Sequence, residues 1–173
     1  MPKTVYIAVG AKRDAETGNV FCAATLSYEG AETDYKARFT DILTRTIAQS
    51  ETSVSGGLAY VLRKSLNRLT EPCIVRVRIG QATDEITRCM TIYAGAMSKG
   101  THKLTPINLA VYPELIKTIN GHVSGGNIQI GREDDNPLVV EVNEMAESFR
   151  QDWLERTAHL RENKPKSQPQ PSL

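Results

Sequence analysis

The order of apolar patterns along the 173-residue chain is the feature that most limits its fold. Three short runs rich in β-branched and apolar residues come first, and they predict three consecutive strands. Helical spacing then alternates with two further strand-like runs and ends in one long helix. Strands joined by turns pair antiparallel, whereas strands separated by helices pair parallel. We therefore expect an α/β fold with one mixed five-stranded sheet and helices on both faces. The expected strands are 4–9, 20–28, 34–40, 73–79 and 122–130; the expected helices are 43–69 with a break at 53–57, a segment from 83, 107–119 and 138–161.

The length and composition fit one domain. Apolar residues make up 40% of the chain and charged residues 24%, which is typical of a globular protein. We expect a single domain over residues 1–162. Residues 163–173 hold three prolines and no apolar pattern, so we expect a disordered tail there.

The cysteines and the amino terminus indicate the cellular compartment in which we expect the protein. Cys22, Cys73 and Cys89 are odd in number, lie among apolar residues and lack the close spacing of a zinc or redox motif. The first residues show no signal-peptide pattern, and no apolar run reaches 18 residues. We expect reduced thiols in a soluble, cytoplasmic protein that does not associate with membranes.

Charge is distributed unevenly, although the net charge is only +1. Residues 51–118 hold nine basic and five acidic side chains, whereas residues 119–160 hold three basic and eight acidic ones. Such a chain could present a basic face to an anionic partner. Complementary solvated faces of one domain explain the same pattern.

Five short strings stand out by their order and spacing, namely Tyr6–Ala11, Ser55–Leu62, Val77–Gln81, Val123–Gly126 and Asn143–Glu147. Taken together they resemble ribonuclease H over residues 4–155. The resemblance implies the mixed sheet described above, and an activity in which two divalent metals held by carboxylates cleave the RNA strand of a hybrid. An accidental resemblance and a different α/β fold stay open at this point.

Most of that family's catalytic positions are changed in this chain. The resemblance places Val9 at the first aspartate, Ser55 at the glutamate, Gly80 at the second aspartate and Gly126 at the histidine. Only Glu147 keeps an acid. Because magnesium needs oxygen ligands and negative charge, the resemblance implies the fold without the catalysis.

Arg76 and Arg78 are the most unusual residues, because they share one face of a strand that is expected to be central. A buried lone charge is costly, so each must pair or reach a cleft. One interpretation is pairing with acids of the last helix, such as Glu147. The other is a cleft that binds phosphate, carboxylate or a partner's acidic side chain, extended by Lys99 and Lys103.

The leading functional hypothesis is a catalytically inactive ribonuclease H-like domain that acts as a protein-binding or regulatory module. It requires no cofactor and favours a protein partner or a homo-oligomer. The apolar face of the last helix, with Phe149 and Trp153, is the candidate partner surface.

Two alternatives stay open. The chain could bind a nucleic-acid hybrid or duplex without cleaving it, although aromatic residues for base stacking make up only 6%. It could also be a divergent nuclease that uses magnesium or manganese. That nuclease would need relocated carboxylates, namely Glu147 with Asp14, Asp84 or Asp134.

Overall fold

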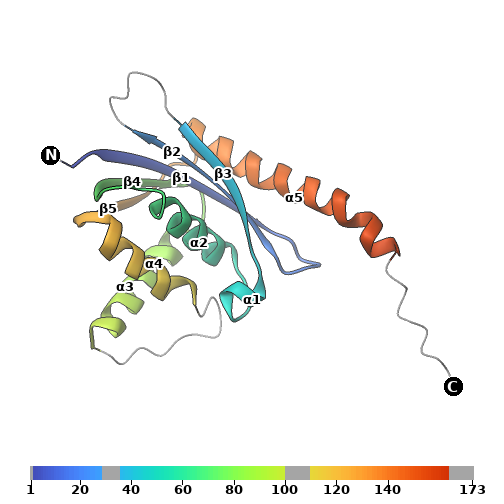
Figure 1. The fold of residues 1–173 in the computed structure, drawn as a ribbon, viewed down its shortest axis with the longest axis horizontal. Coiled ribbons are helices and arrows are strands. Elements are labelled where there is room, and N and C mark those ends of the chain that lie inside the picture. The colour runs from blue at the N-terminus through green and yellow to red at the C-terminus, as the bar shows by residue number, and fades with distance from the viewer. Residues whose placement is uncertain (1, 29–35, 100–109, 164–173) are drawn as a thin grey trace.

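The computed structural model describes residues 2–28, 36–99 and 110–163. The expected sheet is confirmed: its five strands lie in the order β3-β2-β1-β4-β5 (Figure 1). The β1–β2 and β2–β3 pairs are antiparallel, and the β1–β4 and β4–β5 pairs are parallel. The elements are β1 (Thr4–Arg13), β2 (Val20–Tyr28), β3 (Lys36–Leu43), α1 (Arg45–Ala48), α2 (Val54–Leu66), β4 (Cys73–Ile79), α3 (Thr83–Lys99), α4 (Val111–His122), β5 (Val123–Arg132) and α5 (Pro137–Asn163).

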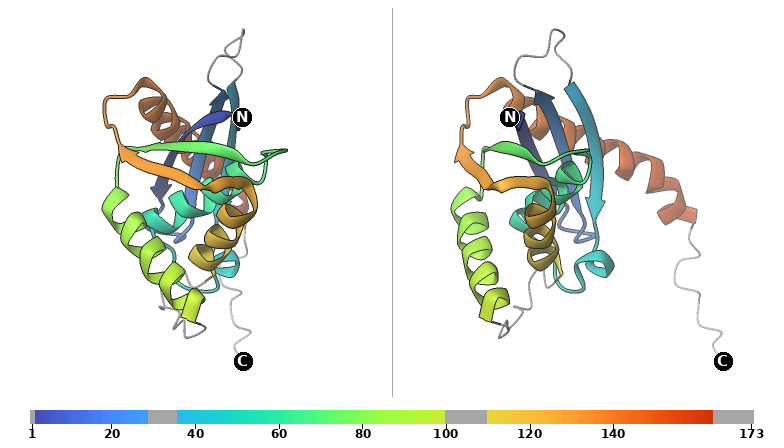
Figure 2. Two further views of the ribbon diagram at one scale, coloured as in Figure 1. Left: turned by 90° about the vertical axis from the view of Figure 1, so that its left-hand side faces the viewer. Right: turned by 60° about the vertical axis from the view of Figure 1, so that its left-hand side comes forward.

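Helices cover both faces of the sheet, as expected. The side chains of β1 alternate between two apolar clusters. Val5, Ile7 and Val9 pack with α2 and α4 in the main core. Ala8 faces the other way and packs with Val139 and its neighbours on α5. Figure 2 shows α2, α3 and α4 on one side of the sheet and α5 on the other.

Several boundaries differ from the sequence expectation. The helix expected at 43–69 is interrupted, as expected, but at other residues than 53–57: β3 runs to Leu43, α1 is a single turn, and α2 begins at Val54. Ser53 causes the new start, because its hydroxyl accepts a hydrogen bond from the Gly56 amide at 3.1 Å and caps the helix. Helix α5 extends to Asn163, one residue beyond the expected domain end, and residues 164–173 lie outside the described residues.

Helix α5 covers only part of its face of the sheet. It packs on β1 and β2, whereas the same face of β4 and β5 carries half-buried or exposed polar side chains. None of the described helices is long and apolar enough to cross a membrane. The three cysteines, all in the described part, form no disulfide.

Candidate functional site

The parallel strands β1 and β4 bring two glycines together under α5. Val9 is paired with Ile79, so Gly10 and Gly80 follow at adjacent positions. Strand alternation points both toward α5. The Asn143 side chain lies against both positions: a Cβ atom on Gly10 would lie 2.7 Å from its Oδ1, and one on Gly80 would lie 3.4 Å from its Nδ2.

The backbone of α5 also lies directly on Gly10. A Cβ atom there would be 2.8 Å from the Val142 carbonyl carbon and 2.9 Å from the Asn143 nitrogen. No side chain fits at this position unless α5 moves, which explains why glycine is needed here. Val9, which the resemblance placed at the first aspartate, is fully buried on the opposite face. The residue that shares a site with Gly80 is therefore Gly10, which the sequence analysis missed.

Glu147, the retained acid, is part of a charged network. Its Oε1 accepts a hydrogen bond from Arg150 Nη1 at 3.2 Å, and Arg150 Nη2 donates to Asp14 Oδ1 at 3.2 Å. Asp14 is 3% exposed, and its other oxygen accepts hydrogen bonds from the Thr17 amide and hydroxyl. Burial raises the pKa of Asp14, but the hydrogen bonds from Thr17 and the hydrogen bond and charge of Arg150 outweigh burial, so the pKa lies below its ordinary value.

The acids proposed for a relocated metal site lie in different places: Asp14 and Glu147 share Arg150, whereas Asp134 Oδ1 would lie 3.6 Å from a Cβ atom on Gly80. Asp134 pairs with Arg132 at 3.1 Å, and this hydrogen bond raises the pKa of the arginine. Asp84 is exposed in the first turn of α3. Within residues 2–28, 36–99 and 110–163, no group of three His, Cys, Asp or Glu side chains could hold a metal ion.

The other two positions of the resemblance also lack metal-ligand character. Ser55 is buried in the first turn of α2, where its hydroxyl lies 3.0 Å from that of Ser53. Gly126 is exposed at the start of β5 with a φ of 70°. Ser55 therefore belongs to the start of α2, and Gly126 belongs to the irregular start of β5.

Arg76 and Arg78 lie together on the open face of β4. Arg76 Nη1 donates to Asn127 Oδ1 at 3.1 Å, and Arg78 Nε pairs with Glu133 Oε2 at 2.5 Å. The expected pairing with the last helix is therefore wrong, because both partners come from β5 and the loop after it. Arg78 Nη1 would lie only 3.7 Å from a Cβ atom on Gly131, so its guanidinium group lies over β5 at this residue.

A pocket of 380 Å³ opens beside Arg78, between β1, β2 and the start of α5. Two lysines were expected to extend this surface. Lys99 ends α3, which lies on the opposite side of the sheet (Figure 2), and Lys103 lies outside the described residues. The pocket is lined by Tyr6, Ile7, Ala8, Ser27, Arg78, Glu133, Asn136 and Leu138.

Phe149 and Trp153 contact the domain itself. Their rings lie 5.3 Å and 5.4 Å from the ring of Phe21 on β2, in edge and tilted arrangements. Both residues are half-buried. Beyond them, α5 extends past the sheet (Figure 1) and carries Leu160, which is 60% exposed. The intramolecular contact accounts for both aromatic rings, and their role as a partner surface stays a prediction.

No protein-family model and no curated protein sequence matches the chain. Its structure is similar to that of LC9-RNase H1, a type 1 RNase H with the type 2 active-site motif, with a TM-score of 0.56 and 11% identity over 86% of this chain and 72% of that one. The PFV RNase H domain has a TM-score of 0.50 and 12% identity, over 84% and 90%. LC11-RNase H1, solved in complex with an RNA/DNA hybrid, has a TM-score of 0.50 and 13% identity, over 82% and 95%. At these identities the likeness concerns the fold alone. The chain has a ribonuclease H-like fold.

Proposed function

We propose that the chain is a catalytically inactive ribonuclease H-like domain that acts as a protein-binding or regulatory module. The observation that most supports this proposal is the direct packing of α5 on Gly10, with the Asn143 amide between Gly10 and Gly80. Two-metal catalysis requires carboxylates that hold both ions. The Asn143 amide is neutral, the two glycines have no side chain, and Asp134, whose Oδ1 would lie 3.6 Å from a Cβ atom on Gly80, is paired with Arg132. Hard cations need uncompensated negative charge.

The surrounding charges support the same proposal. Glu147 and Asp14 share Arg150, and Asp134 pairs with Arg132. A divalent cation would have to displace a guanidinium group from each acid before it could bind. Like charges in close contact repel, so these arginines oppose metal binding.

A protein partner fits the open face better than nucleic acid does. Arg78 is already paired with Glu133, and Asp134 and Asp135 follow as exposed acids. Acidic side chains beside the arginines repel a phosphate backbone, whose binding depends on uncompensated positive charge. A protein partner can instead place single acidic side chains against single arginines.

Binding of nucleic acid without cleavage is the alternative. It is supported by the likeness in fold to LC11-RNase H1, whose structure contains an RNA/DNA hybrid. In this chain Arg76 and Arg78 would then contact phosphates. Such binding should weaken steeply as the salt concentration rises.

The test is to incubate the purified chain with magnesium or manganese and a labelled RNA–DNA hybrid, and to score cleavage and binding together. We expect no cleavage and no salt-sensitive binding. Metal-dependent cleavage that is lost in Glu147→Gln would overturn the proposal. Salt-sensitive binding that is weakened in Arg76→Gln and Arg78→Gln, but unchanged in the exposed control Arg156→Gln, would favour the nucleic-acid alternative.

A further inference from the structure

The edge of the sheet at β5 is open to pairing. Within the described residues β5 is the last strand of the sheet, so one row of its backbone N–H and C=O groups has no neighbouring strand. Proteins usually protect such edges with prolines, charges or short strands. The strand β5 is irregular at Gly125 and Gly126, but from Ile128 to Arg132 it pairs regularly with β4. It has no proline, and Arg132 at its end is its only charged residue. It is therefore well suited to accept another strand.

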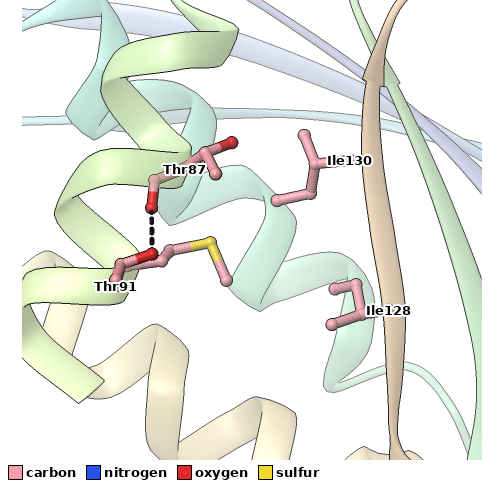
Figure 3. A pocket seen from close by; sticks show the side chains of 5 residues that line it. Thr87, Thr91, Ile128 and Ile130 are labelled. Carbon is pink, nitrogen blue, oxygen red and sulfur yellow. Dashed lines mark hydrogen bonds between the residues drawn. The ribbon is translucent and has the colours of Figure 1, made fainter. Parts of the chain in front are cut away.

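A small apolar pocket lies next to this edge, between α3 and β5. Figure 3 shows Thr87 and Thr91 of α3 facing Ile128 and Ile130 of β5 across it. Met90 completes the lining, and the volume is 180 Å³. Small-molecule sites usually measure about 300–1,000 Å³. A pocket of this size suits a single aliphatic side chain.

The opposite face of the same edge carries two arginines, of which Arg78 is paired with Glu133. Arg76 reaches β5 through its hydrogen bond to Asn127, and the guanidinium group of Arg78 lies over Gly131. Gly131 has no side chain to separate that group from the edge. A strand added beside β5 would lie about 4.8 Å from it. Its side chains on this face would then come within reach of both arginines.

We propose that β5 binds an extended segment of a protein partner by strand addition. In that segment, acidic residues alternate with aliphatic ones. An aliphatic side chain enters the pocket between α3 and β5, and the acidic side chains on the other face meet Arg76 and Arg78. Backbone hydrogen bonds supply affinity in this mode, and alternate side chains supply specificity. The inference rests on the proposed binding function and names the partner for it.

Other occupants fit the charges less well. A second copy paired antiparallel through β5 would place its own Arg76 and Arg78 on the same side of the joined sheet, which brings like charges together. The last ten residues of the chain contain two lysines, three prolines and no acid. Prolines cannot donate to a ladder, and lysines would repel the arginines. Only an acidic, apolar strand complements both faces.

The test uses a fluorescent peptide of about nine residues, an ordinary strand length, in which glutamate alternates with valine and isoleucine. A second peptide replaces each glutamate with lysine. Two further peptides carry N-methyl groups on alternate amides, one on the odd and one on the even residues. Alternate amides of a strand point to opposite edges, so strand addition predicts that one methylated peptide loses binding and the other keeps it. Fluorescence anisotropy measures the affinities.

The protein variants separate the two faces of the site. Arg76→Gln combined with Arg78→Gln should weaken binding of the acidic peptide about tenfold. Glu133→Gln should strengthen it several-fold, because Glu133 competes for Arg78. Thr91→Trp should weaken it by filling the pocket, and the distant Arg156→Gln should leave it unchanged.

Three outcomes would overturn the inference. They are no binding of the acidic peptide up to about 1 mM, equal binding of both methylated peptides, and dimerisation through β5 without peptide binding. None of them affects the proposed lack of catalysis, which only metal-dependent cleavage of the hybrid would refute. The two proposals can therefore fail separately.

Discussion

The substitution Gly10→Ala tests the feature on which the proposed inactivity depends. The new methyl group would lie 2.7–2.9 Å from three atoms, of which two belong to the α5 backbone. A backbone cannot rotate away as a side chain can, so the whole helix must move. We expect the variant to be clearly less stable than the wild-type chain.

The expected loss follows from two opposing effects. Overpacking of a filled contact costs about 1–3 kcal/mol, and a clash with backbone atoms belongs at the upper end of this range. Replacing glycine with alanine in a strand recovers about 0.5–1 kcal/mol through lower backbone entropy in the unfolded chain. The net loss should be about 2 kcal/mol. For a chain of this size, it lowers the melting temperature by about 4–8 °C.

Two other glycines provide matched controls. Gly121 in α4 has no atom within 4 Å of the added methyl group. Gly121→Ala should therefore stabilise the chain by about 0.5 kcal/mol. At Gly80 the nearest atom is 3.0 Å away, in the Val139 side chain, which can adjust. Gly80→Ala should fall between the other two variants.

Chemical denaturation followed by circular dichroism measures the free energy of unfolding of all three variants. The reasoning predicts that stability decreases in the order Gly121→Ala, Gly80→Ala, Gly10→Ala. If Gly10→Ala is as stable as Gly121→Ala, then the backbone of α5 does not pack closely on Gly10 of β1. Room for a side chain, and with it for a carboxylate, would then exist there.

Three further predictions concern the rest of the site. Asp14→Asn should lower stability by about 2 kcal/mol at pH 7. Since the pKa of Asp14 is depressed in the folded state, its contribution is present above the unfolded pKa of about 3.9 and is lost as the pH falls below it. Denaturation curves should therefore show the difference from wild type shrinking below about pH 4. Trp153→Ala should cost about 1–2 kcal/mol, because the ring packs on Phe21; an unchanged stability together with a lost dimer or partner would instead place Trp153 on a partner surface. Magnesium should leave the melting temperature unchanged. With free magnesium at one hundred times the Kd of a bound site, the free energy of unfolding would instead rise by about 2.7 kcal/mol, and the melting temperature would rise visibly.

The sheet could be predicted from the sequence because its signals are local. The apolar runs at 20–28 and 73–79 match β2 and β4 at every boundary. Pairing directions followed from whether a turn or a helix joins two strands. Part of the helix expected at 43–69 was wrong, because β3 continues to Leu43. The pairing of β3 with β2 outweighs the helical spacing that follows in the sequence.

The site was harder to predict because it depends on which residues face one another across the sheet. The choice between Val9 and Gly10 is a difference of one residue, which in a strand exchanges the two faces. The partners of Arg76 and Arg78 come from β5 and the loop after it, and their approach depends on the register between β4 and β5. Sequence spacing along the chain does not contain this register.

The absence of side chains at positions 10 and 80 and the close packing of α5 on the sheet are linked. Several carboxylates held close together repel one another unless a cation lies between them, so such a site weakens the fold when no metal is bound. Glycine at positions 10 and 80 removes that repulsion and lets the helix backbone approach the strand ends. Arg150 then joins Asp14 of the hairpin loop to Glu147 of α5 and fixes the helix without a metal. In the proposed inactive domain the arginines of β4 serve no catalysis, so their face of the sheet is available for the proposed recognition.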